Sequence, residues 1–241
     1  MINRRVDAIA LAPIDKMALV RVVERAAEEK IPVIIFDSGI DTDRFVSQVA
    51  TDNYRAGQMA AERMASILDG KGKVAIVAVQ PGGASTMQRE QGFEDSVQKN
   101  FPGIQIVDKR YGMADFAKSL DVALNMMTAH PEAAGMFASN ESSTVGAAQA
   151  VKQRSGRIKL VGFDWSPQLI DDLKSGVIDS LVVQHPFRMG EESVMAALAK
   201  LKGEPVTKIN NIAPRLILKD DLDKPDVQSR INPDIKKYLG Q

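Results

Sequence analysis

The chain has 241 residues, 44% of them hydrophobic and 26% charged, a composition typical of a globular protein with a buried core. Its 31 basic and 31 acidic residues cancel, which argues against nucleic acid or another polyanion as a partner. The lack of cysteine excludes disulfide bonds and thiolate chemistry, and no apolar run approaches the ~20 residues that a membrane-spanning helix needs.

The first predicted elements form a β-α-β unit. Residues 6–11 are an apolar run that predicts a buried strand, and residues 17–29 carry apolar side chains at helical spacing. A second apolar run, Val33–Phe36, follows Pro32, and residues 47–50 predict a short third strand. Two consecutive strands joined by a helix are expected to be parallel, with a right-handed connection.

Strand and helix patterns alternate over the rest of the chain. The predicted helices cover residues 58–68, 89–99, 117–129, 142–153, 166–175 and 188–202. The predicted strands cover residues 74–79, 104–107, 135–138, 160–163 and 181–183. Apolar strands separated by helices are typical of parallel sheets that helices cover on both faces. The sequence therefore predicts an α/β protein with doubly wound parallel sheets.

Polar side chains recur where the predicted strands end. These candidates are Asp37, Asn140, Asp164 and Gln184, together with Arg89 in the first turn of a predicted helix. A positive charge in the first turn opposes the helix dipole, which favours a functional role for Arg89. In parallel sheets ligands bind beyond the carboxyl ends of the strands, and planar carboxylate, amide and guanidinium groups suit the neighbouring hydroxyls of a sugar.

Two aromatic side chains, Phe116 and Trp165, offer flat apolar faces for the C–H side of a sugar ring. Each candidate also has a structural interpretation. Polar residues at strand ends are often turn formers or helix caps, and a lone tryptophan is as often part of the core.

Catalytic and metal sites are not predicted. The two histidines, His130 and His185, are too scattered for a zinc site. The phosphate-binding loop, the dinucleotide fingerprint and the G-x-S-x-G elbow are not found in the sequence. We therefore expect no catalytic residue, no metal and no cofactor.

An ordered series of short segments resembles the ribose-binding-protein branch of the periplasmic sugar-binding proteins, whose fold is shared with the effector domains of lactose-repressor-type regulators. The segments are Asp37, then 51–53 (TDN), 89–93 (REQGF), 114–116 (ADF), 128–131 (TAHP), 137–141 (FASNE), 161–164 (VGFD) and 183–184 (VQ). The resemblance runs from about residue 6 to residue 218.

The resemblance implies two α/β lobes joined by three crossovers, with the ligand held between them by hinge closure. The first lobe would comprise residues 1–52 plus 185–212, and the second residues 53–184 plus 213–241. Met1 falls inside what would be the family's second helix. The resemblance therefore implies an incomplete first lobe, with about sixty residues absent in front of Met1 by the family layout, a number that typical domain sizes allow. We expect the exposed strand edges and apolar surface of that lobe to favour a homodimer, or the lobe to be marginally stable.

The resemblance also assigns roles to the candidate residues. Asp37 would bind sugar hydroxyls from the first lobe, and Phe116 would pack against the ring. The second lobe and hinge would contribute Arg89, Asn140, Asp164 and Gln184. Ser38 stands where the ribose binders carry an arginine, which argues against ribose itself as the ligand. Ser38 and Trp165 are two further candidates for ligand-binding residues.

The implied function is that of a non-enzymatic solute-binding component of an ABC-type sugar uptake system. It would bind a monosaccharide or related polyol and present it to a membrane permease. The intact protein would be periplasmic, although this chain shows no signal peptide. One alternative is the ligand-sensing domain of a regulator or chemoreceptor with the same fold. Another is an enzyme such as a sugar isomerase or hydrolase, which would need a base near the ligand.

Overall fold

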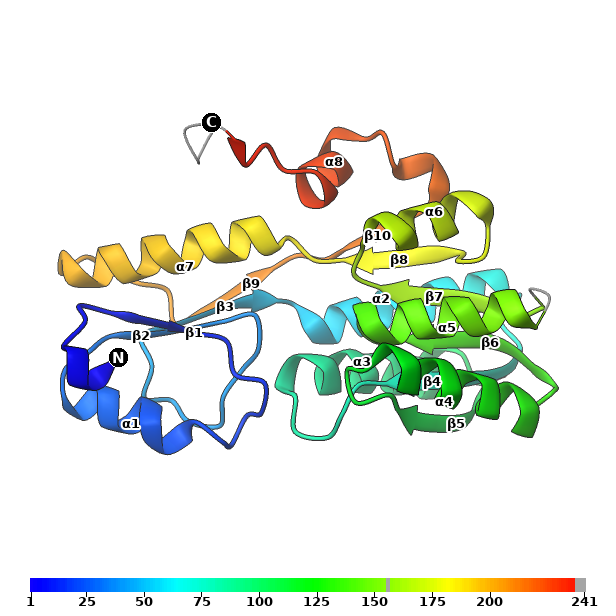
Figure 1. Ribbon diagram of the computed structural model, residues 1–241, viewed down its shortest axis with the longest axis horizontal. Coiled ribbons are helices and arrows are strands. Elements are labelled where there is room, and N and C mark those ends of the chain that lie inside the picture. Colours follow the sequence, from blue (N-terminus) through cyan, green and yellow to red (C-terminus); the bar gives the residue numbers. More distant parts are fainter. Residues whose placement is uncertain (155–156, 237–241) are drawn as a thin grey trace. The chain divides into compact units, whose positions relative to one another are not determined.

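The computed structural model describes residues 1–154 and 157–236, and the chain divides into two units (Figure 1). Unit 1 comprises Met1–Asp52, Pro81–Met87 and His185–Ala213. Unit 2 comprises Asn53–Gln80, Gln88–Gln184 and Pro214–Gln241. Of the second lobe expected from the resemblance, residues 155–156 and 237–241 lie outside the described residues.

Unit 1 is built on a four-stranded parallel sheet with the order β1-β2-β3-β9. The strands are β1 (Ile9–Leu11), β2 (Val33–Phe36), β3 (Ser47–Thr51) and β9 (Ile209–Ile212). Successive strand residues point to opposite faces, so Val33 packs on α1 (Val20–Glu28) whereas Ile34 packs on α7 (Pro186–Leu201). The two helices therefore cover opposite faces of the sheet. A short 3-10 helix, η1 (Ile2–Arg4), precedes β1.

Unit 2 is built on a six-stranded sheet with the order β10-β8-β7-β6-β4-β5. The strands are β4 (Gly72–Ala78), β5 (Ile104–Tyr111), β6 (Ala133–Ala138), β7 (Lys159–Phe163), β8 (Ser180–Val183) and β10 (Arg215–Ile217). The edge strand β10 runs antiparallel to β8, and the other neighbouring pairs are parallel.

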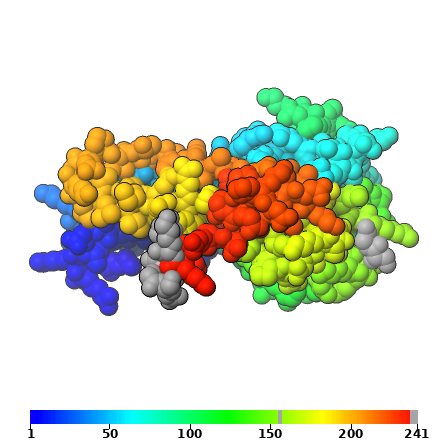
Figure 2. Space-filling view, turned by 90° about the horizontal axis from the view of Figure 1, so that it is seen from above, coloured from blue at the N-terminus to red at the C-terminus, as the bar shows by residue number. Residues whose placement is uncertain are grey.

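Helices cover both faces of this second sheet. One face packs on α2 (Asn53–Ile67) and α3 (Ala84–Asn100) through residues such as Ile76. The other face carries α4 (Phe116–Ala129), α5 (Glu141–Gln153), α6 (Pro167–Ser175) and α8 (Pro225–Ile231). The 3-10 helix η2 (Lys219–Asp221) leads into α8, and Figure 2 shows this C-terminal segment lying on the surface next to α6.

The predicted α/β class with doubly wound parallel sheets is confirmed, with three corrections to the elements. The strand predicted over residues 6–11 begins only at Ile9, because its partner β2 begins at Val33 and Pro32 has no N–H to extend the ladder. Arg89 was expected in a first helical turn, but α3 begins at Ala84, so the dipole argument for Arg89 is wrong.

The third correction concerns the late strands β9 and β10, which the sequence did not predict. Strand β9 contains Asn210 and Asn211 between two isoleucines, and β10 has three residues, so neither forms a recognisable apolar run.

Among the described helices, none combines the length and the apolar character that crossing a membrane requires.

The carboxyl ends of four neighbouring strands meet at one edge of unit 2. Strands β8, β7, β6 and β4 are consecutive in the sheet, and they are followed by Gln184, Asp164, Ser139 and Val79 respectively. Side chains far apart in the sequence therefore lie close together at this edge.

Candidate functional site

A buried arginine lies at the centre of this edge. Arg89, in the second turn of α3, has a side chain that is only 3% exposed. Its Nε donates to Asn53 Oδ1 at 2.8 Å, and its Nη1 donates to the carbonyl oxygen of Ser139 at 3.0 Å. The guanidinium also lies 3.8 Å from the centre of the Phe163 ring. These contacts offset the cost of removing the charge from water.

Asp164 places a carboxylate beside this guanidinium. One carboxylate oxygen lies 3.7 Å from Arg89 Nη1 and accepts from the backbone N–H of Glu141 at 3.2 Å. The other accepts from Gln184 Nε2 at 2.6 Å. Asp164 directly follows β7 with a φ of +66°, a left-handed conformation that aspartate tolerates better than most residues. Asp164 thus joins the ends of three elements into one network.

Two glycines explain how α2 and α3 bring Asn53 against Arg89. A Cβ atom on Gly57 would lie 2.0 Å from the carbonyl oxygen of Arg89, and one on Gly92 would lie 2.1 Å from that of Tyr54. The two helix backbones therefore touch at this point, and only glycine fits at either position.

Glu90, the neighbour of Arg89, fixes the segment behind the site. It is 1% exposed, and its Oε1 accepts from the N–H of Val79 at 3.1 Å and from the hydroxyl of Ser139 at 3.0 Å. Its other oxygen lies 3.1 Å from Lys109 Nζ. Glu90 thereby ties the ends of β4 and β6 together, and it holds Ser139, whose carbonyl receives Arg89.

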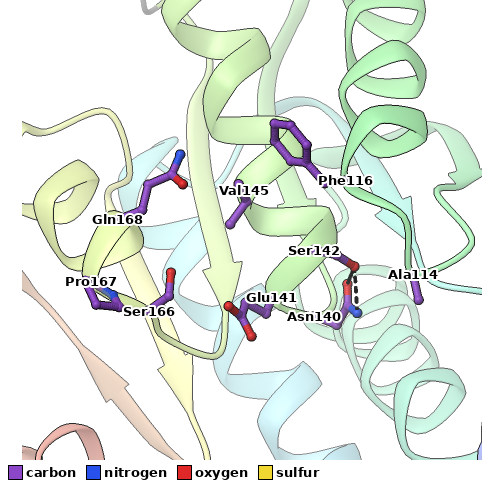
Figure 3. A pocket seen from close by; sticks show the side chains of 9 residues that line it. All are labelled: Ala114, Phe116, Asn140, Glu141, Ser142, Val145, Ser166, Pro167 and Gln168. Atoms are coloured by element: carbon purple, nitrogen blue, oxygen red, sulfur yellow. Dashed lines mark hydrogen bonds between the residues drawn. The ribbon is translucent and has the colours of Figure 1, made fainter.

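Asn140 and Phe116 line a cavity of about 740 Å³ within unit 2 (Figure 3). Asn140 caps α5 by accepting from the N–H of Ser143 at 2.9 Å. Phe116 is the first residue of α4 and remains 45% exposed. Glu141 lies between them and α6; partial burial and, secondarily, the Asp164 carboxylate raise the pKa of its carboxyl above the ordinary value.

In unit 1, Asp37 occupies a position that parallels that of Asp164. It directly follows β2, has a φ of +64°, and donates its N–H to the carbonyl oxygen of Val49 at 3.0 Å. Asp164 donates its N–H to Val182 in the same way at 2.9 Å. Next to Asp37, Ser38 is 5% exposed, and its hydroxyl oxygen accepts from the N–H of Ser85 at 3.3 Å.

Trp165 directly follows Asp164. Its side chain is partly buried against the core of unit 2 and lines a second cavity with residues 231–236. The structure thus brings Arg89, Asp164 and Gln184 together and places Asn140 and Phe116 on the adjoining cavity. Asp37 and Ser38 lie in unit 1.

The structure adds residues that the sequence did not name as ligand candidates, although all lie in segments that carry the resemblance, namely Asn53, Glu90, Ser139 and Glu141. The histidines have local contacts: His185 Nδ1 accepts from the N–H of Arg188 at 3.4 Å and caps α7, while His130 Nε2 lies 3.2 Å from Asp108. Within residues 1–154 and 157–236, no group of three or more His, Asp or Glu side chains forms a candidate metal site.

Comparison with known proteins places this geometry in a family. The family described as "Periplasmic binding protein domain" matches residues 1–205. The chain belongs to this family. A periplasmic binding protein domain is consistent with two α/β units and with polar residues at strand ends.

Three relatives illustrate the similarity. The ribose import binding protein RbsB of Bacillus subtilis is 30% identical over 208 residues, which cover 86% of this chain and 67% of that protein. An ABC transporter solute-binding protein of Agrobacterium vitis, solved with α-D-tagatopyranose, superposes with a TM-score of 0.91 at 34% identity. The superposition covers 95% of this chain and 81% of that protein's chain. A carbohydrate transporter solute-binding protein of Agrobacterium radiobacter, solved with D-arabinose, has a TM-score of 0.92 at 34% identity. This superposition covers 96% of this chain and 80% of the other.

Proposed function

We propose that this periplasmic binding protein is the solute-binding component of an ABC-type sugar uptake system and binds a monosaccharide or related polyol without chemically changing it. The observation that carries the proposal is the connected network of Arg89, Asp164 and Gln184 at neighbouring strand ends. Similar proteins that are named for ribose or were solved with tagatose or arabinose support the same substrate class.

The network offers a sugar both donors and acceptors in defined positions. The carboxylate of Asp164 accepts hydrogen bonds from hydroxyls, the guanidinium of Arg89 donates, and the amide of Gln184 does both. Neighbouring groups already hold these side chains, so little side-chain entropy is lost on binding. Hydrogen bonds to charged groups contribute roughly 1.5–3 kcal/mol each, so a few of them support the ~8 kcal/mol of micromolar affinity.

The proposed ligand residues are Asp37, Arg89, Phe116, Asn140, Asp164 and Gln184, with Ser38 and Trp165 as secondary candidates. We further propose that units 1 and 2 are the two lobes of the family and that a membrane permease is the partner of the intact protein in the periplasm. Ser38 favours a ligand other than ribose. Its short hydroxyl is buried and accepts from Ser85, so it does not supply the long cationic donor that the ribose binders have there.

Titration calorimetry of the whole chain tests the proposal. The panel contains D-ribose, D-arabinose, D-tagatose, further pentoses and hexoses, and polyols. We expect saturable binding of at least one member with a micromolar or lower Kd, with D-ribose weaker than the preferred sugar, and chromatography should recover the sugar unchanged. If no member releases heat, the proposal is wrong; if a product forms, the chain is an enzyme rather than a binding protein.

A further inference from the structure

The cavity beside the Arg89 network extends beyond the residues that the family resemblance assigns. It shares Asn140 and Phe116 with the proposed ligand site, and it continues past Glu141 to the first turn of α6, where Ser166 and Gln168 line it. Its volume of about 740 Å³ falls within the ~300–1,000 Å³ range of small-molecule sites. Figure 3 shows the Glu141 side chain between Asn140 and Ser166. The ligand site therefore has an adjoining space with its own polar side chains.

The only charge among the side chains that line this cavity is negative. Glu141 is the one ionisable side chain among the residues that line the cavity, and its carboxylate pairs with no cation in the part of the chain that the structure describes. The neighbouring guanidinium of Arg89 is already shared with Asp164. A carboxylate in this position favours a group that donates hydrogen bonds or carries a positive charge, and it repels an anion.

The helix ends around the cavity do not reverse this preference. Helices α5 and α6 begin here, and the N–H groups of a helix start can bind an anion. However, several of these N–H groups already donate to side chains: Ser143 to Asn140 at 2.9 Å, and Leu169 to Ser166 at 3.4 Å. The N–H of Glu141 donates to Asp164 at 3.2 Å. Partial burial and, secondarily, the Asp164 carboxylate raise the pKa of Glu141, and the second of these causes places another negative charge near the cavity.

We propose that this cavity is a subsite for a hydroxyl- or ammonium-bearing part of the ligand, and that Glu141 selects neutral and amino sugars against sugars that carry a carboxylate or phosphate. The exposed face of Phe116 would cover the apolar side of this part of the ligand. The proposal rests on the proposed sugar-binding function and deepens it by naming the charge class of the ligand.

Titration calorimetry with matched sugars tests the subsite. The probes are D-glucose, D-glucosamine and D-glucuronate, the corresponding galactose set, and D-ribose with D-ribose 5-phosphate. In the unmodified chain, we expect each amino sugar to bind at least as tightly as its parent. We expect the carboxylate or phosphate form to bind about tenfold more weakly or worse, the size of effect that a like charge several ångströms away produces in a partly solvated site.

Two variants separate Glu141 from other causes of selectivity. In Glu141→Gln, the ratio of Kd values between anionic and amino forms should fall about tenfold, while the neutral parents change by less than about threefold. Glu204→Gln removes the same charge from an exposed position in unit 1 and should leave every ratio unchanged.

The outcomes distinguish this proposal from the one on which it rests. If the neutral sugars bind but the ratio is the same in the unmodified chain and in Glu141→Gln, the subsite is refuted and sugar binding stands. The subsite is likewise refuted if the anionic sugars bind best. It is also refuted if neither the amino nor the anionic form of any bound sugar binds the unmodified chain or Glu141→Gln. If no sugar of this panel or of the wider panel binds the unmodified chain, both proposals fall.

Discussion

At the scale of single residues, the site depends on a charged pair that is costly to bury. Arg89 is almost completely buried, and its partner Asp164 stays 21% exposed at the side chain. A buried ion pair of this kind is weak support for stability, since desolvation offsets much of the attraction. Its position at the sheet edge agrees with the ligand-binding role proposed for Arg89 and Asp164.

Replacing Asp164 by asparagine tests this interpretation. Asparagine tolerates the left-handed backbone, so the chain should fold. In the variant, however, an NH2 group replaces one of the two carboxylate oxygens. Either Gln184 Nε2 or the N–H of Glu141 therefore loses its acceptor. We expect sugar affinity to fall at least tenfold, about 1.4 kcal/mol, and the free energy of unfolding to fall by about 1–2 kcal/mol.

Calorimetry and urea denaturation provide the two measurements. Asp171→Asn on the exposed face of α6 makes the same chemical change and should leave both quantities unaltered. Unchanged affinity in Asp164→Asn would show that this carboxylate does not contact the ligand.

Much of the residue pattern at the sheet edge could be predicted from the sequence. Asp164 and Gln184 directly follow short apolar runs, so parallel-sheet geometry alone places them at one edge. Asn53 and Glu90 could not be placed in this way. Their roles depend on how α2 and α3 pack and on which strand ends they reach, and neither the residue type nor the spacing carries that information.

At the scale of elements, the contact between α2 and α3 determines where Arg89 lies. Gly57 and Gly92 let the two backbones touch, as the 2.0 Å and 2.1 Å approaches of added Cβ atoms show. The spacing of apolar residues predicts both helices but not this contact, because a glycine inside a helical pattern signals reduced helix propensity rather than a partner. The short strands β9 and β10 escaped prediction for a related reason: their pairing depends on neighbours distant in sequence.

Gly57→Ala should separate the two helices. The added methyl group has no space, and overpacking of this kind costs about 1–3 kcal/mol. We expect a lower free energy of unfolding in urea and, because Arg89 shifts with its helix, weaker sugar binding.

Gly190→Ala is the matched control. Gly190 also lies inside a helix, α7, but nothing lies within 4 Å of an added Cβ atom. This variant should gain about 0.5–1 kcal/mol from helix propensity and bind sugar normally. If both glycine variants behave alike, the close contact does not control the position of Arg89.

At the scale of the whole molecule, unit 1 leaves apolar surface exposed. On α7, Val194, Leu198 and Leu201 recur at helical spacing and are 57%, 44% and 49% exposed. Strand β1 is the edge of its sheet, and Val22 on α1 is 50% exposed. Exposed strand edges and contiguous apolar patches favour association with another chain. The homodimer expected from the sequence stays a prediction.

Light scattering during gel filtration checks it. We expect a dimeric mass at tens of micromolar protein, and Leu198→Lys should shift the mass towards the monomer. Ile235→Lys, at an apolar residue in unit 2 that is 49% exposed, is the control and should not. A monomer at every concentration would count against association through unit 1.

The late positions of β9 and β10 have a consequence for how the protein is made. During synthesis, the sheet of unit 1 lacks one strand until Ile209–Ile212 has been made. The sheet of unit 2 lacks one strand until Arg215–Ile217 has been made. Neither sheet can therefore be completed before the segment from Ile209 to Ile217 has emerged from the ribosome, and the two units complete their sheets nearly together. Closing sheets with such distant partners is slow, so the nascent chain depends on staying unaggregated until its final strands emerge.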